Sequence, residues 1–138
     1  MPASEALRQA WLTTQYRVRL SRGGYAAIRI GAPLPAALRP LLATDDEPWG
    51  FITAWNPRAQ PRDRAANRAA QRALRQALRE RGARQRAGAG VGTDGWREPS
   101  LFVLGLDFDA LDALAMHFAQ AAIVRGCGSG HAELRTYV

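Results

Sequence analysis

The sequence predicts a single α+β domain with a mainly antiparallel sheet, hairpins at both ends and three to four helices, one of them long and basic. Strand-like and helical patterns alternate irregularly along the 138 residues, which disfavours a regular β-α-β arrangement. Turn-linked strand pairs occupy both ends of the chain. No internal repeat or composition break interrupts residues 1–138, so one domain is expected.

Strands are expected where side chains alternate in polarity or form short apolar runs bounded by turn residues. The predicted strands are residues 16–20, 25–30, 50–55, 101–106, 121–125 and 131–137. The first two and the last two are joined by glycine-containing turns and therefore predict hairpins.

Helices are expected where a capping residue precedes a run of helix-forming residues. The starts are marked by Ser4, Pro35, Asp63 and either Asp107 or Asp109. The predicted helices are residues 4–13, 35–43, 63–81 and 107–119. A proline inside the second of these predicts that it is short or kinked.

Residues 83–95, between the basic helix and the next strand, are rich in glycine and contain no large apolar side chain except Val91. A phosphate-binding loop would need a preceding strand and a following helix, which is the reverse of the order expected here. We therefore expect residues 83–95 to form a flexible, exposed loop.

Positive charge is concentrated in one segment of the chain. All 19 basic residues are Arg, against 12 acidic residues, for a net charge of +7. Ten of the Arg lie between Arg58 and Arg86 together with Asp63 and Glu80, so this segment carries 10 − 2 = +8 and the remainder 7 − 8 = −1. Such asymmetry makes the segment a candidate for contact with an anionic partner.

The predicted helix over residues 63–81 separates its arginines from its apolar side chains. At 100° per residue, five Arg share an 80° stripe about 22 Å long, and Leu74 and Leu78 lie on the opposite face. The stripe consists of Arg64, Arg68, Arg72, Arg75 and Arg79. One interpretation is a surface for nucleic acid or another phosphate-bearing ligand, because Arg forms bidentate contacts with phosphate. The other is a solvated helix face in a chain rich in Ala and Arg.

Several classes of protein are disfavoured. The longest uncharged stretch, residues 113–124, is shorter than the about 20 residues of a membrane-spanning helix, so no membrane partner is expected. The first residues lack the apolar core of a signal peptide. The single Cys127 permits neither an internal disulfide nor a cysteine zinc site. A cytoplasmic protein is the expectation.

Other reactive side chains give weak signals. Asp107, Asp109 and Asp112 contain oxygen ligands for a divalent cation, but acidic residues at a helix start favour capping. His117 and His131 have no partner at a diagnostic spacing. No catalytic residue, metal site or cofactor is therefore predicted, and whether the protein is an enzyme stays open.

The side chain of Asn67 projects from the apolar face of the predicted basic helix, between Leu74 and Leu78. A buried amide must be hydrogen-bonded, so Asn67 is expected either to tie down a neighbouring loop or to face a polar pocket. Asn56, at the end of a predicted strand, has the same alternatives. Residues 96–100 place an aromatic ring, an ion pair and a hydroxyl just before a strand.

These residues carry a resemblance to a known family. The segments Thr53-Ala54-Trp55-Asn56-Pro57, Asn67, Trp96-Arg97-Glu98-Pro99-Ser100 and Gln120-Ala121-Ala122-Ile123 resemble the motif series of a small bacterial family, the domain-of-unknown-function family 3293, over about residues 16–137. The resemblance implies a small cytosolic domain and no established activity. The pocket candidates it singles out are Trp55, Asn56, Asn67, Trp96, Glu98, Ser100 and Gln120.

Three functions remain open at this point. The first is a small cytosolic bacterial protein that binds nucleic acid or another phosphate-bearing ligand through its arginine-lined helix, with Trp55 and Trp96 available to stack on bases. The alternative is an accessory or interaction protein whose motifs are structural. A small enzyme with a cleft around Asn56, Asn67 and Glu98 is less favoured, with Glu98 as its acid or base. The oligomeric state is left open.

Overall fold

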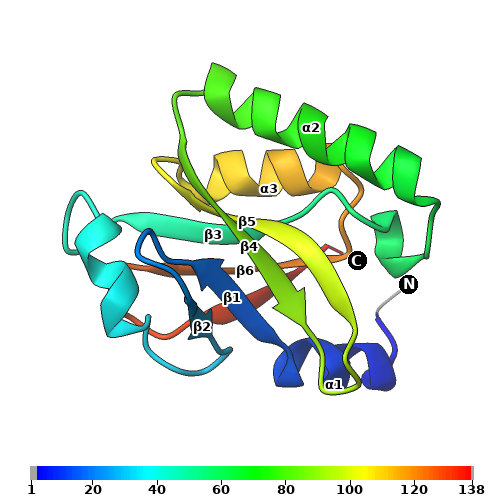
Figure 1. The fold of residues 1–138 in the computed structure, drawn as a ribbon, viewed down its shortest axis with the longest axis horizontal. Coiled ribbons are helices and arrows are strands. Elements are labelled where there is room, and N and C mark those ends of the chain that lie inside the picture. The colour runs from blue at the N-terminus through cyan, green and yellow to red at the C-terminus, as the bar shows by residue number, and fades with distance from the viewer. Residues whose placement is uncertain (1–2, 138) are drawn as a thin grey trace.

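A seven-stranded antiparallel sheet dominates the structure, a computed structural model in which residues 3–137 are described (Figure 1). The strands are β1 (Gln15–Arg19), β2 (Tyr25–Ile28), β3 (Pro48–Ile52), β4 (Arg84–Val91), β5 (Arg97–Leu104), β6 (Ala122–Cys127) and β7 (Glu133–Thr136). Their order in the sheet is β2-β1-β4-β5-β3-β6-β7. The predicted α+β class and the hairpins β1–β2 and β6–β7 are confirmed.

Three α-helices and two short 3-10 helices accompany the sheet in residues 3–137. They are α1 (Glu5–Thr13), η1 (Ala36–Leu41), η2 (Pro57–Ala59), α2 (Arg64–Glu80) and α3 (Phe108–His117). Ser4, Asp63 and Asp107 cap the three α-helices by accepting a backbone N–H with their side chains, as predicted. Among these residues, none of the helices has both the length and the apolar character that crossing a bilayer requires.

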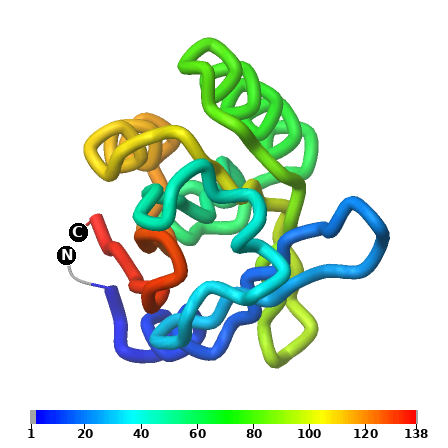
Figure 2. The backbone as a smooth tube through the Cα atoms, turned by 90° about the vertical axis from the view of Figure 1, so that its left-hand side faces the viewer, coloured from blue at the N-terminus to red at the C-terminus, as the bar shows by residue number. Residues whose placement is uncertain are grey.

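The sheet curls until the segments beside its two edge strands meet. The backbone N–H of Gly31, just after β2, donates to the carbonyl of Ala132, just before β7, at 2.8 Å. The N–H of Ala132 donates in turn to the carbonyl of Ala32 at 2.9 Å, and Ile30 bridges Ala132. The curled sheet therefore has an enclosed concave face and a convex face, and α2 and α3 lie together on the convex side (Figure 2).

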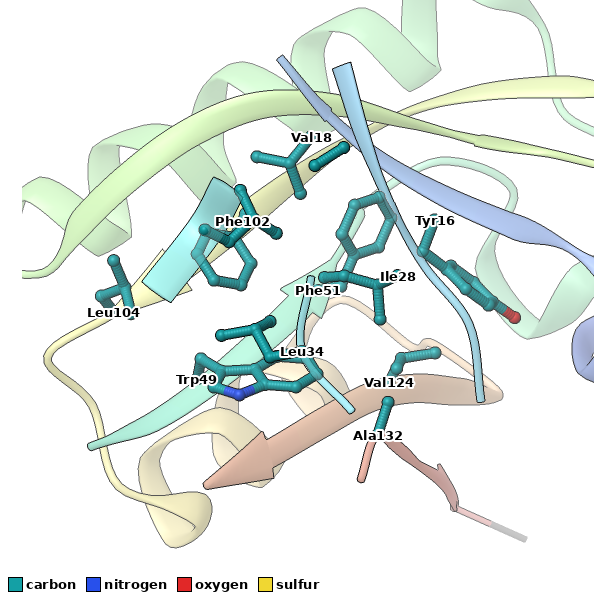
Figure 3. Packing of buried hydrophobic residues seen from close by; sticks show 12 residues of the cluster. Tyr16, Val18, Ile28, Leu34, Trp49, Phe51, Phe102, Leu104, Val124 and Ala132 are labelled. Atoms are coloured by element: carbon teal, nitrogen blue, oxygen red, sulfur yellow. The ribbon is translucent and has the colours of Figure 1, made fainter. Parts of the chain in front are cut away.

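The concave face encloses the first of two hydrophobic clusters (Figure 3). Trp49 and Phe102 are fully buried in it, and Leu34 lies beside Trp49 (Figure 3). Tyr16 and Phe51 meet edge to face, with ring centroids 5.4 Å apart. The hydroxyl of Tyr16 points away from the other labelled side chains (Figure 3), so the apolar packing ends at this residue.

The second cluster lies between the convex face of the sheet and the helices α2 and α3. Leu74 and Leu78 of α2 are fully buried there, as the predicted apolar face requires. Helix α3 approaches β3 closely, because a Cβ at Gly50 would lie 2.8 Å from the side chain of Leu111. Both helices therefore fix the end of β3, which leads into the candidate site.

The predicted loop over residues 83–95 is wrong, because residues 84–91 form β4 in the interior of the sheet. Glycine in a loop allows flexibility, but here it permits close approach of neighbouring strands. A Cβ at Gly88 would lie 2.3 Å from the carbonyl oxygen of Arg17 in β1. The tight β4–β5 pairing also starts β5 at Arg97 instead of the predicted residue 101.

Candidate functional site

A cavity of about 360 Å³ opens at the end of the curled sheet that α1 covers. Eight elements and their adjoining turns contribute to its wall, and α1 supplies Leu7, Ala10, Trp11 and Thr13. Its volume lies in the range of about 300–1,000 Å³ typical of pockets for small organic molecules. The mouth of a curled sheet is also a common place for such pockets.

Strand alternation determines which side chains enter the cavity. In β5, Glu98 and Ser100 lie on the same face as Phe102 of the inner cluster, since residues two apart in a strand share a face. The apolar wall includes Phe51, Ile123, Val124 and Leu134. Further polar side chains in the lining come from other segments, among them Thr14, Asn56 and Gln120.

Glu98 is the buried carboxyl group of this cavity. It is 8 % exposed, and no ion pair engages it within the described residues. Burial raises the pKa of the Glu98 carboxyl to about 8, against a smaller opposing effect of the Thr53 hydroxyl. Near neutral pH the carboxyl is therefore mainly protonated and can both donate and accept a hydrogen bond.

The hydroxyl groups around Glu98 are already engaged. Ser100 Oγ donates to the backbone carbonyl of Glu98 at 3.2 Å, and Tyr16 Oη donates to the carbonyl of Trp11 in α1 at 2.6 Å. Burial raises the pKa of the Tyr16 hydroxyl, which stays neutral. The lining contains neither histidine nor cysteine, so no imidazole activates Ser100 as a nucleophile.

Asn67 does not line the cavity, but its hydrogen bonds stabilise residues 54–59, which form the rim of the cavity. It is 1 % exposed. Its Oδ1 accepts from the backbone N–H of Asn56 and from Arg62 Nε, both at 2.9 Å. Its Nδ2 donates to Asn56 Oδ1 at 2.9 Å. Asn67 therefore ties down the neighbouring segment, and of the predicted cleft residues Asn56, Asn67 and Glu98 the cavity lining contains Asn56 and Glu98.

Gln71 and Gln120 complete this support of the rim. Gln71 Oε1 accepts from the backbone N–H of Ala54 at 2.8 Å, and Gln120 Nε2 donates to the carbonyl of Trp55 at 3.1 Å. Sequence reasoning missed Gln71, although it lies one turn after Asn67 and at 340° shares the same buried helix face. The angular argument applied to Asn67 would have identified it.

The supported rim contains strained backbone. Asn56 has φ +46° and ψ +64° immediately before a proline, where an extended conformation is normal. Arg58 and Ala59 also have positive φ, at 55° and 59°. Asn56 and Ala59 both line the cavity. Left-handed residues other than glycine persist where surrounding contacts hold them, and they cluster at binding sites.

The remaining pocket candidates lie at different depths. Trp96 is 47 % exposed and lines the cavity at its edge, whereas Trp55 is partly buried and outside the lining.

The acidic residues around α3 are engaged within the protein. Asp107 caps α3, and Asp112 accepts from the hydroxyl of Tyr137 at 2.6 Å. Within residues 3–137, no three His, Cys, Asp or Glu side chains gather in a way that could hold a metal ion.

The arginine stripe of α2 is a separate surface. Its five members, Arg64, Arg68, Arg72, Arg75 and Arg79, are all exposed. None forms an ion pair with an acidic side chain among the residues described. Arg79 donates to the side chain of Gln76 at 2.7 Å. The stripe therefore faces solvent, and none of its members lines the cavity.

Comparison with family models places part of the chain in a known family. A family model described as "Protein of unknown function (DUF3293)" matches residues 52–123, just over half of the chain. This span is narrower than the 16–137 suggested by the motifs, but it contains Asn56, Asn67, Glu98 and Gln120. Neither the curated proteins nor the solved structures provide a match.

Proposed function

The chain belongs to the DUF3293 family of proteins of unknown function, and we propose that it is a binding module that holds a small organic molecule in the cavity beneath α1. One observation carries this proposal: a carboxyl group without an ion pair, that of Glu98, lies inside a cavity of about 360 Å³. An apolar cavity with a few convergent polar groups and a perturbed pKa is the arrangement expected of a ligand site.

The test uses one helix position to block the cavity and another as its control. Ala10 is exposed on α1 and lines the cavity, whereas Ala6 is exposed on the same helix outside the lining. Ala10→Trp should fill the opening, and Ala6→Trp should leave it free. A fragment library is screened by ligand-observed NMR against wild type and both variants.

The expected result is a set of fragments that bind wild type and Ala6→Trp and lose at least about tenfold in affinity with Ala10→Trp. The proposal is overturned if no fragment binds wild type, or if every hit binds Ala10→Trp equally well. Both variants remain folded by circular dichroism if the positions tolerate Trp as their exposure suggests.

A second candidate function is binding of nucleic acid, or another phosphate-bearing ligand, through the arginine stripe. The observation that favours it is five exposed guanidinium groups without acidic partners along one helix. Like charges one turn apart are unfavourable by a few tenths of a kcal/mol each in a helix, and bound phosphates would relieve that repulsion.

The stripe is tested by titrating labelled tRNA and duplex DNA at several salt concentrations. The stripe variant replaces its five Arg with Gln, and the control variant replaces five exposed Arg elsewhere, namely Arg8, Arg19, Arg22, Arg29 and Arg39. Both variants lose the same net charge. We expect the logarithmic salt slope to shrink by about 3–4 in the stripe variant on duplex DNA, at about 0.9 per phosphate contact. Equal slopes in the two variants would contradict a specific surface.

A further inference from the structure

The ionisable side chains in the lining of the cavity include acidic ones, whereas the chain as a whole is basic. The chain carries 19 Arg and a net charge of +7, yet no Arg lines the cavity. The charged residue types in the lining are Asp94, at the tip of the β4–β5 turn, and Glu98, deep on β5. A phosphate or carboxylate ligand would therefore meet acidic groups and no cation at this site.

Aromatic side chains surround the same space from several directions. Trp11 comes from α1, Tyr16 from β1, Phe51 from β3 and Trp96 from the turn before β5. Aromatic faces attract cations within about 6 Å of the ring centroid, and the attraction strengthens where water is excluded. Arg side chains already use this contact elsewhere in the protein, as Arg17 lies 4.2 Å from the ring centroid of Tyr25.

We infer that the ligand of this cavity is a small organic cation, an amine with an apolar body, whose charged group faces Glu98 while its body contacts the aromatic wall. This inference rests on the proposed function above and specifies its ligand. Asp94, exposed at the edge of the cavity, attracts the cation during entry. The ammonium group of the ligand would be the counter-charge of the buried Glu98 carboxylate, which has no ion pair within the described residues.

Cation binding is coupled to proton release from Glu98. The titratable groups that the surrounding elements add to the lining are Tyr16 from β1 and Asp94 from the turn, and α1, β3 and β6 add none. The hydroxyl of Tyr16 stays neutral because burial raises its pKa. Since the pKa of Glu98 is raised to about 8 by burial, the carboxyl must lose its proton to pair with the ammonium group.

The test compares three probes with the same apolar body and different head-group charge: phenethylamine, 2-phenylethanol and phenylacetate. Affinities are measured by titration calorimetry at pH 6, 7 and 8. We expect the amine to bind wild type at least about tenfold more tightly than the alcohol, and phenylacetate to bind most weakly. Amine affinity should rise about tenfold or more from pH 6 to pH 8, with proton release detected by repeating the titration in buffers of different ionisation enthalpy.

Three variants separate the cavity carboxylates from general effects of charge. Glu98→Gln should remove both the preference for the amine and its rise with pH. Asp94→Asn, at an exposed position, keeps an oxygen that can accept from the backbone N–H of Trp96, and it should lower amine affinity a few fold and keep the rise with pH. Glu5→Gln, exposed on α1 outside the lining, is the matched control and should change neither property.

The outcomes distinguish this inference from the proposed function. If the alcohol or the carboxylate binds wild type as tightly as the amine, and Ala10→Trp blocks it, the cation inference is overturned and the cavity remains a binding site. Binding of none of the three probes also overturns the inference, and the fragment screen then decides the proposed function independently. An amine preference that persists in Glu98→Gln would contradict the role given to this carboxyl.

Discussion

Asn67 and Asn56 exchange two hydrogen bonds although eleven positions separate them in the chain. Asn67 Oδ1 accepts from the backbone N–H of Asn56, and Asn67 Nδ2 donates to Asn56 Oδ1, each at 2.9 Å. One amide on α2 thereby fixes both the backbone and the side chain of a left-handed residue at the cavity rim. The rim conformation depends on the helix behind it.

Replacing Asn67 with Ala should lower the free energy of unfolding by about 2–3 kcal/mol. The change leaves the backbone N–H of Asn56 and the Nε of Arg62 without their acceptor, and each unsatisfied buried group is unfavourable by about 1–3 kcal/mol. Urea denaturation measures the loss. Arg68→Ala, on the exposed face of the same helix, is the control and should stay within about 0.5 kcal/mol of wild type. A similar value for both would show that the amide bonds contribute little.

Two glycines of β4 should respond differently to alanine. A Cβ at Gly88 would meet backbone, the carbonyl oxygen of Arg17 at 2.3 Å, so β1 must move and we expect a loss of about 2–4 kcal/mol. At Gly90 the Cβ would meet Thr14 Cγ2 at 3.7 Å, an ordinary contact. Gly90→Ala should therefore change stability by less than about 1 kcal/mol. Equal denaturation midpoints for the two variants would refute this account of the close β1–β4 approach.

The raised pKa of Glu98 predicts a stability that depends on pH. Between its ordinary value of 4.5 and about 8 the folded state keeps the proton that the unfolded chain releases. The unfolded state then binds fewer protons, so stability falls as pH rises through this window and levels off above it. The loss should be on the order of a few kcal/mol between pH 5 and pH 9. Chemical denaturation at pH 5 and pH 9 should show a much smaller loss of stability for Glu98→Gln than for wild type. An equal loss in the two proteins would contradict an unfavourable burial of the ionised Glu98.

Tyr16→Phe should loosen α1 without disturbing the sheet. The phenol donates to the carbonyl of Trp11 at 2.6 Å, and α1 contains no fully buried residue to hold it otherwise. Loss of one hydrogen bond of about 1 kcal/mol raises the equilibrium constant for local opening, and with it the exchange rate, about fivefold. Hydrogen exchange of the α1 amides reports this change. Tyr25→Phe, whose ring is half exposed, should leave exchange in α1 unchanged.

The features that the sequence predicted correctly depend on residues close together in the chain. Helical angles placed Asn67 among buried residues and the arginines in solvent, and both positions are confirmed. The helical angle of Gln71 places it on the same buried face. The cavity depends instead on contacts between segments as distant as α1 and β7, because Leu7 and Leu134 share its wall. The local sequence pattern cannot show such pairing. It also failed for residues 84–91, where Gly88 and Gly90 lie between two neighbouring strands.

The bridge that closes the curled sheet has a consequence for the order of folding. Ile30 and Ala132 are about a hundred residues apart in the chain, and their bridge lies beside the two edge strands of a sheet that contains all the strands between them. Contacts between such distant residues form against a large loss of chain entropy and depend on earlier local structure. During synthesis the cavity therefore has no complete wall until Leu134 has left the ribosome. An assay of ligand capture by stalled nascent chains would find binding only in those long enough to expose β7.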